Sequence, residues 1–192
     1  MDTYRVVLYI HLLALLLGIG AGSVLLTCLF QLRAAGTVEQ AVPWGIVSGK
    51  VARLFPVAIL GLFLTGAYMT HKLWTWNTAW IDVAIAGLVL LGVQGGGIAE
   101  HTAKKLQVAM MANGPGPLGP EARRMTLHPG LWVVELANLG IVLGIVWNMT
   151  EKPGWGESIA SVLVGYAVGV GLALLFSRAP QDDPVAATES VG

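Results

Sequence analysis

Charged side chains are scarce in this sequence, and their scarcity argues against an ordinary water-soluble domain. Asp, Glu, Lys and Arg make up only 11% of the 192 residues, whereas soluble domains average about 25%. The formal net charge is zero, so no basic excess indicates a nucleic-acid partner. Cysteine is represented only by Cys28, which excludes a disulfide within the chain and which we interpret as a small packing residue.

Several motifs that carry familiar chemistry are also missing. The sequence contains no CxxCH for covalent haem attachment, no HExxH zinc motif, no P-loop and no GxSxG nucleophile turn. These absences argue against a c-type cytochrome, a zinc hydrolase of that type, a P-loop enzyme and an α/β-hydrolase. Any chemistry must therefore come from isolated polar residues.

Long apolar runs are abundant instead. Hydrophobic residues make up 55% of the chain and the mean hydropathy is +0.71. A helix needs about 20 apolar residues to cross a bilayer, and five runs qualify: 4–32, 51–71, 80–104, 131–150 and 158–176. We predict an all-α, polytopic transmembrane helical bundle that forms one domain, 1–177, followed by a disordered cytoplasmic tail, 178–192. The alternative is four spans, with the last helix peripheral.

Lys and Arg are distributed unevenly between the predicted connections, and this predicts the orientation. One side of the bundle carries eight basic residues: Arg33, Lys50, Arg53, Lys104, Lys105, Arg123, Arg124 and Arg178. The other side carries only Arg5, Lys72 and Lys152. Because cytoplasmic connections are enriched in Lys and Arg, we predict the amino terminus outside and the carboxyl terminus in the cytoplasm. On the cytoplasmic side, the glycines and prolines of 113–120 predict a flexible loop.

Small residues predict how the helices pack. Within lipid, close approach through small side chains does much of the work that the hydrophobic effect does in water. Gly18 and Gly22 follow His11 by seven and eleven residues, which places all three on one face of the first helix. We therefore expect His11 to face protein rather than lipid. Further glycines of this kind occur in the third and fifth spans: Gly92, Gly95, Gly96, Gly97, Gly165 and Gly169.

One set of polar residues lies toward the predicted extracellular side. Depths assigned from a rise of about 1.5 Å per residue define this outer polar group: His11, Thr65, Tyr68, His71 and Asp82. Each member has a simpler interpretation as well. Asp82 suits the first turn of a helix, where the dipole favours a carboxylate, and His71 suits the water interface. For His11, a structural role and a ligand role are both open.

A second set lies toward the predicted cytoplasmic side. This inner polar group consists of Gln94, Glu100, His101, His128, Glu135 and Asn138. Glu135 is the most informative member, because a carboxylate inside a span is costly and usually has a function. Asn138 follows it by one turn, and His128 precedes it by seven residues on the same face. Alternatively, Glu135 and Asn138 form an interhelical hydrogen bond that only holds the bundle together.

Histidine in a helical bundle is a natural axial ligand of haem. His11 and His71 differ in depth by about 10 Å on the helical rise, which disfavours a site that uses both. A haem or porphyrin held by His11 alone, with His11 as the metal ligand, therefore remains the cofactor hypothesis.

Two stretches of the sequence resemble a known group of membrane proteins. One runs from Tyr9 to Gly22, with a histidine before a glycine-rich face, and the other from Arg124 to Glu135. Over the predicted helices before the last, the chain resembles small bacterial integral membrane proteins that include the haem-associated protoporphyrinogen oxidases, the membrane domain of copper-resistance protein D and uncharacterised relatives. The resemblance implies a multi-pass protein of the bacterial inner membrane.

In those oxidases a first-span histidine is essential, and His11 matches its position. This chain places Asp82 where the oxidases use a lysine, so the uncharacterised relatives are its nearest counterparts.

Three functions from different classes follow. The first is a redox protein that binds haem or a porphyrin through His11. The second is a small transporter or ion-coupled carrier that uses Glu135, with Asn138 and Gln94 along its path. The third is a non-catalytic membrane subunit or scaffold whose glycine faces bind a second copy of the chain or another membrane protein. The sequence leaves open whether the protein is an enzyme.

Overall fold

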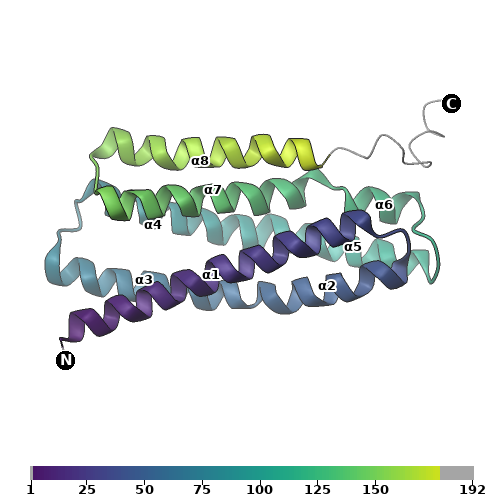
Figure 1. The fold of residues 1–192 in the computed structure, drawn as a ribbon, viewed down its shortest axis with the longest axis horizontal. Coiled ribbons are helices and arrows are strands. Elements are labelled where there is room, and N and C mark those ends of the chain that lie inside the picture. The colour runs from purple at the N-terminus through teal and green to yellow at the C-terminus, as the bar shows by residue number, and fades with distance from the viewer. Residues whose placement is uncertain (1, 178–192) are drawn as a thin grey trace.

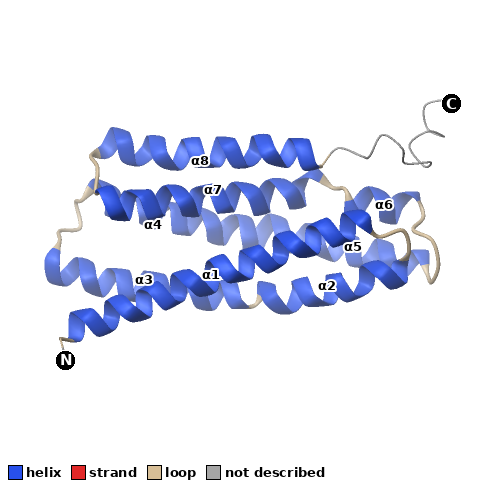
Figure 2. Ribbon diagram, viewed as in Figure 1, coloured by secondary structure: helices blue, strands red, loops and turns tan. Residues whose placement is uncertain are grey.

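The computed structural model describes residues 2–177, which fold into helices joined by short turns (Figures 1 and 2). The predicted disordered tail, 178–192, lies outside the described residues. In chain order the elements are α1 (Thr3–Ala34), α2 (Val38–Ala52), α3 (Leu54–Leu73), α4 (Ala79–Val93), the π-helix η1 (Gln94–Ala99), α5 (Glu100–Asn113), α6 (Pro120–Thr126), α7 (Pro129–Glu151) and α8 (Trp155–Phe176).

Five helical segments are long and apolar enough to cross a membrane. They are Thr3–Ala34, Val38–Leu73, Ala79–Asn113, Pro120–Glu151 and Trp155–Phe176. This confirms the predicted all-helical architecture and is compatible with a five-span membrane bundle. Figure 1 shows that the amino terminus and the α3–α4 and α7–α8 connections share one end, called here the amino-terminal end. The α1–α2 turn (35–37) and the α5–α6 loop (114–119) share the other, called here the basic end.

Three helices occupy sequence that we expected to be connections. α3 alone has 20 residues, or about 30 Å, which is the thickness of the hydrocarbon core. α2, α5 and α6 lengthen the bundle beyond such a span. Hydropathy could not predict them, because it reports membrane burial rather than helix formation. Local signals do explain α2 and α5: Thr37 caps α2 by accepting Gln40 N at 3.4 Å, and α5 ends at Gly114, whose φ is +71°.

The α5–α6 loop is attached to the α1–α2 turn at the basic end. Val38 N donates to Gly116 O at 2.9 Å, and Leu118 N donates to Gly36 O at 3.0 Å. The Glu39 carboxylate accepts a further hydrogen bond from Gly116 N at 2.8 Å. The segment is therefore non-helical, as its glycines and prolines predict, and both loops are held against each other.

A hydrophobic core lies beside these loops and joins all five segments. Its buried residues come from α1, α2, α5, the α5–α6 loop, α6, α7 and α8, and include Leu32, Ala41, Met110, Leu118 and Trp132. Burial of this apolar surface supports helices that extend past a bilayer and would otherwise be short and marginal in water.

α7 and α8 pack backbone against backbone. A Cβ atom added at Gly140 would collide with the backbone of Gly165, and one added at Gly165 would collide with Gly140. One turn further on, a Cβ at Gly169 would collide with the backbone of Leu136. The structure thereby confirms the packing role predicted for Gly165 and Gly169.

The third span uses its glycines differently from our expectation. An added Cβ at Gly92, Gly95, Gly96 or Gly97 would meet nothing within 4 Å. These glycines therefore bring no other described helix close. Three of them lie within η1, where the chain adopts the wider π-helical geometry, a feature that often marks functional positions.

Candidate functional site

The first candidate site is the contact between α1 and α3 around His11. His11 is 5% exposed, so it faces protein, as the glycine spacing predicted. Small residues bring the two helices together here: Gly18 faces Ala58, and a Cβ at Gly66 would lie 3.6 Å from the His11 ring. The His11 Nδ1 atom lies 2.8 Å from Thr65 Oγ1. The structure thus brings together two members of the predicted outer polar group.

The hydrogen bonds of Thr65 favour the His11 tautomer that carries its proton on Nδ1. Thr65 Oγ1 lies 2.5 Å from the Gly61 carbonyl oxygen, and a carbonyl can only accept. The hydroxyl proton therefore goes to Gly61, and Thr65 accepts a hydrogen bond from His11 Nδ1–H. The neutral ring then has a free lone pair on Nε2. Metal-binding histidines are commonly held in this way by a second hydrogen bond.

The other predicted members of the outer group lie near helix ends. Tyr68 is half-buried, and Lys72 Nζ lies 5.8 Å from the centre of its ring. His71 is exposed in the last turn of α3. Asp82 lies in the first turn of α4. Asp82 thus lies at the helix end where the dipole favours a carboxylate, and His71 lies at an exposed helix end, so the structure gives both residues a local explanation.

The second candidate site surrounds Glu135, on the most deeply buried of the five segments. Its carboxyl group faces α1: an added Cβ at Gly22 would lie 3.3 Å from Glu135 Oε1. Glycine at this position leaves space for the carboxyl group between the helices. Within residues 2–177, Glu135 has neither a hydrogen bond nor an ion pair. The face of α1 that meets α3 at Gly18 therefore meets α7 one turn later.

Gln94 is the first residue of η1 and belongs to the helical segment that packs against α7. An added Cβ at Gly87 would lie 2.7 Å from Ile145 Cδ1, and one at Gly130 would lie 3.8 Å from Thr102 Oγ1. These two contacts fix an antiparallel register between the third and fourth segments. Interpolation between them places Gln94, at the start of η1, opposite 137–138.

Two buried polar atoms at this level have no hydrogen-bond partner among the described residues: Gln94 Nε2, a donor, and Asn138 Oδ1, an acceptor. Most buried polar groups are satisfied, so two orphaned atoms beside an unpaired carboxyl group are unusual. We call Gln94, Glu135 and Asn138 the inner polar cluster. Gly22 and His11 are eleven residues apart on α1, about 16 Å along the helix, so this cluster is separate from His11.

The remaining members of the predicted inner group lie elsewhere. His128 is the N-cap of α7, where its Nδ1 accepts a hydrogen bond from Gly130 N at 3.0 Å. Glu100 forms an exposed ion pair with Lys104 at 2.7 Å, and His101 is exposed. Water-facing contacts or helix capping explain all three.

Two of the buried residues that sequence reasoning missed carry polar atoms of special interest. Asn148 is fully buried: its Nδ2 donates to Ser158 O at 3.0 Å, and its Oδ1 accepts from Ser161 Oγ at 2.8 Å. These bonds join α7 to α8. Trp132 is also fully buried, and its Nε1 has no partner in the described chain. An asparagine within an apolar run was a usable signal, whereas the burial of Trp132 was hidden by its resemblance to an interfacial anchor.

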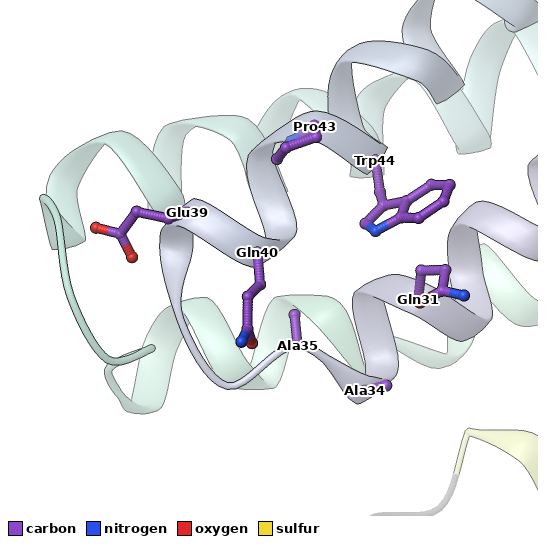
Figure 3. Close-up of a pocket in the computed structure, with 7 residues that line it drawn as sticks. All are labelled: Gln31, Ala34, Ala35, Glu39, Gln40, Pro43 and Trp44. Carbon is purple, nitrogen blue, oxygen red and sulfur yellow. The ribbon is translucent and has the colours of Figure 1, made fainter.

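The described surface also has two pockets. Figure 3 shows the first, of about 390 Å³, where Gln31 at the end of α1 lies across from Gln40 and Trp44 of α2. The second, of about 490 Å³, lies between α7 and α8. Neither pocket is lined by His11 or Glu135. Residues 2–177 contain no group of three or more His, Cys, Asp or Glu side chains that could hold a metal ion.

No protein-family model matches the chain, and neither a curated protein nor a solved structure matches it.

Proposed function

We propose that this chain is a multi-pass membrane carrier that binds a proton or a small monovalent cation at Glu135 and moves it across the bilayer. The observation that carries the proposal is the Glu135 carboxyl group, which lies in an apolar helix without an ion pair or hydrogen bond among residues 2–177. Ionisable residues inside membrane spans commonly mark ion pathways and proton relays.

The need for electrical neutrality supports this function. A bare carboxylate is strongly disfavoured where the dielectric constant is low, so Glu135 requires a positive partner. A bound proton or a small cation meets that requirement. Asn138 Oδ1 offers a second oxygen to the same cation, and Gln94 Nε2 can donate to a carboxylate oxygen. Both atoms are the ones that lack partners within the described helices.

The test is ion flux into liposomes that contain the purified protein. Wild-type protein is expected to carry protons, Na⁺ or K⁺ down an imposed gradient, detected with a dye for each ion. Glu135→Gln keeps the size of the side chain but removes its charge, so we expect flux to fall to the rate of protein-free liposomes. Glu151→Gln, at an exposed residue of the amino-terminal end, is the matched control. Full flux in Glu135→Gln would reject the proposal.

We also propose the orientation in which the basic end faces the cytoplasm of a bacterial inner membrane, with the amino terminus outside. Arg33, Lys104 and Arg123 support this, since they lie toward the basic end. As part of the same proposal, we place the chain with the group of the protoporphyrinogen oxidases and the copper-resistance membrane domain, which its sequence resembles.

A second candidate function is the binding of haem or a porphyrin at His11. The observation in its favour is the contact of His11 Nδ1 with Thr65 Oγ1, which favours the tautomer with an unprotonated Nε2. His11 would ligate the iron, and Thr65 would fix the ring and its tautomer. When bound, the iron would supply one-electron chemistry. The bare α3 backbone at Gly66 already accommodates the imidazole ring.

Haem titration of the purified protein tests this second function. We expect a shifted Soret band in wild-type protein, no shift in His11→Ala, and binding weakened about tenfold in Thr65→Val because the second hydrogen bond is lost. His71→Ala, at an exposed histidine, should bind haem like the wild type. The same spectrum in wild-type protein and in His11→Ala would reject this function.

A further inference from the structure

The second pocket is a groove between α7 and α8 that faces away from the inner polar cluster. Leu143, Gly144 and Trp147 of α7 form one side, and Glu157, Val164 and Gly165 of α8 are among the residues that form the other. Leu143 is 59% exposed and Val164 is 61% exposed. The floor is shallow because glycines bring the two backbones into contact, so side chains on both sides rise above it.

The groove has the length of one leaflet of a bilayer. Trp147 lies four residues and Leu143 eight residues before the last residue of α7, or about 6 and 12 Å. On α8, Glu157 and Gly165 lie two and ten residues after the first, or about 3 and 15 Å. The hydrocarbon core is about 30 Å thick, so one leaflet occupies about 15 Å. The groove thus extends from the level of the headgroups to the middle of the membrane.

Its polar end carries a negative charge beside an aromatic ring. Glu157 lies in the first turn of α8, where the helix dipole favours the ionised carboxylate. It has no ion pair within the described chain. The nearby cation Lys152 is directed elsewhere, with Nζ 5.2 Å from the centre of the Trp74 ring. Trp147 is 56% exposed and can offer its face to a cation.

We propose that this groove is a binding site for a phospholipid with a primary-amine headgroup. One acyl chain lies along Leu143, Gly144 and Val164, and the ammonium group donates hydrogen bonds to the Glu157 carboxylate beside Trp147. Charge complementarity and the length of the groove select this occupant. A quaternary-amine headgroup carries the same charge but has no N–H to donate, and an anionic headgroup is repelled by Glu157.

Native mass spectrometry of protein extracted from vesicles tests the proposal. The vesicles contain equal parts of phosphatidylethanolamine, phosphatidylcholine and phosphatidylglycerol with identical acyl chains. For wild-type protein we expect the retained phosphatidylethanolamine to exceed phosphatidylcholine about two- to fivefold, because only the primary amine can donate hydrogen bonds to the Glu157 carboxylate. Glu157→Gln is expected to abolish this preference. Glu151→Gln, an acid at the same end but outside the groove, should retain it.

Two results would overturn the proposal. Equal retention of the ethanolamine and choline lipids by wild-type protein would remove the role of the headgroup. An unchanged preference in Glu157→Gln would place the lipid elsewhere on the protein. Far-ultraviolet circular dichroism of both variants verifies that each is folded, so that a lost preference reports on the groove.

Discussion

Replacing Gly165 by alanine is expected to force α7 and α8 apart and to lower the free energy of unfolding by about 2–3 kcal/mol. The added methyl group would collide with the Gly140 backbone rather than with a flexible side chain, so no rotamer change can relieve the overlap. Overpacking in a well-packed interior typically costs about 1–3 kcal/mol. The separation would also stretch the Asn148 hydrogen bonds to Ser158 and Ser161, which places the effect at the upper end of that range.

Gly171→Ala is the matched control for this experiment. Gly171 belongs to the same helix, but an added Cβ there meets nothing within 4 Å. Alanine favours a helix over glycine by about 1 kcal/mol, so this variant should be as stable as the wild type or slightly more stable. Unfolding in mixed detergent micelles, followed by circular dichroism, measures both. Equal stability of Gly165→Ala and Gly171→Ala would contradict the backbone contact between α7 and α8.

Replacing Glu135 by leucine is expected to stabilise the fold by about 1–3 kcal/mol, the usual cost of a buried polar group that has no hydrogen-bond partner. The carboxyl group lacks partners among residues 2–177, so its removal breaks no interaction that holds the helices together. Leucine instead supplies apolar contacts against α1 near Gly22. A gain in stability on this substitution would indicate that Glu135 is not kept for the stability of the fold.

The contrasting variant is Asn148→Leu. Asn148 is equally a polar residue within an apolar helix, but both ends of its amide are hydrogen-bonded. We expect this variant to lose about 1 kcal/mol, because Ser158 O and Ser161 Oγ are left without that partner. The same micelle unfolding experiment measures both changes. If Glu135→Leu proved as destabilising as Asn148→Leu, Glu135 would be a structural clasp and not an ion site.

Membrane physics made the coarse architecture readable from the sequence. Apolar length alone identified the five segments, since every spanning helix must exceed a fixed thickness. Helical rise is also constant, and for that reason depth arithmetic paired His11 with Thr65 correctly. By the same measure it separated His11 from Glu135.

Which helix backbones come into close contact could not be predicted from the sequence in the same way. Gly165 and Gly96 look alike in an apolar run, yet Gly165 touches another helix and Gly96 touches none within the described chain. The difference depends on how each helix is rotated, which a short sequence window does not encode. The helices α2 and α5 escaped prediction for a related reason, because their burial comes from a core assembled by distant segments.

The π-helix η1 has a mechanical consequence for the third segment. A return of Gln94–Ala99 to α-helical hydrogen bonding would shift the chain beyond it by one residue, a rotation of about 100°. An added Cβ at Gly95, Gly96 or Gly97 meets no atom within 4 Å, so the glycines themselves do not obstruct that rotation, but it would move Leu106 and Met110 of α5 within the hydrophobic core. Within the third segment, the one extra residue in the π-helix therefore sets how far α5 is rotated about the helix axis relative to α4. Gln94 is the first residue of η1. A rotation of α5 at the basic end would therefore also change the position of the Gln94 side-chain amide relative to Asn138.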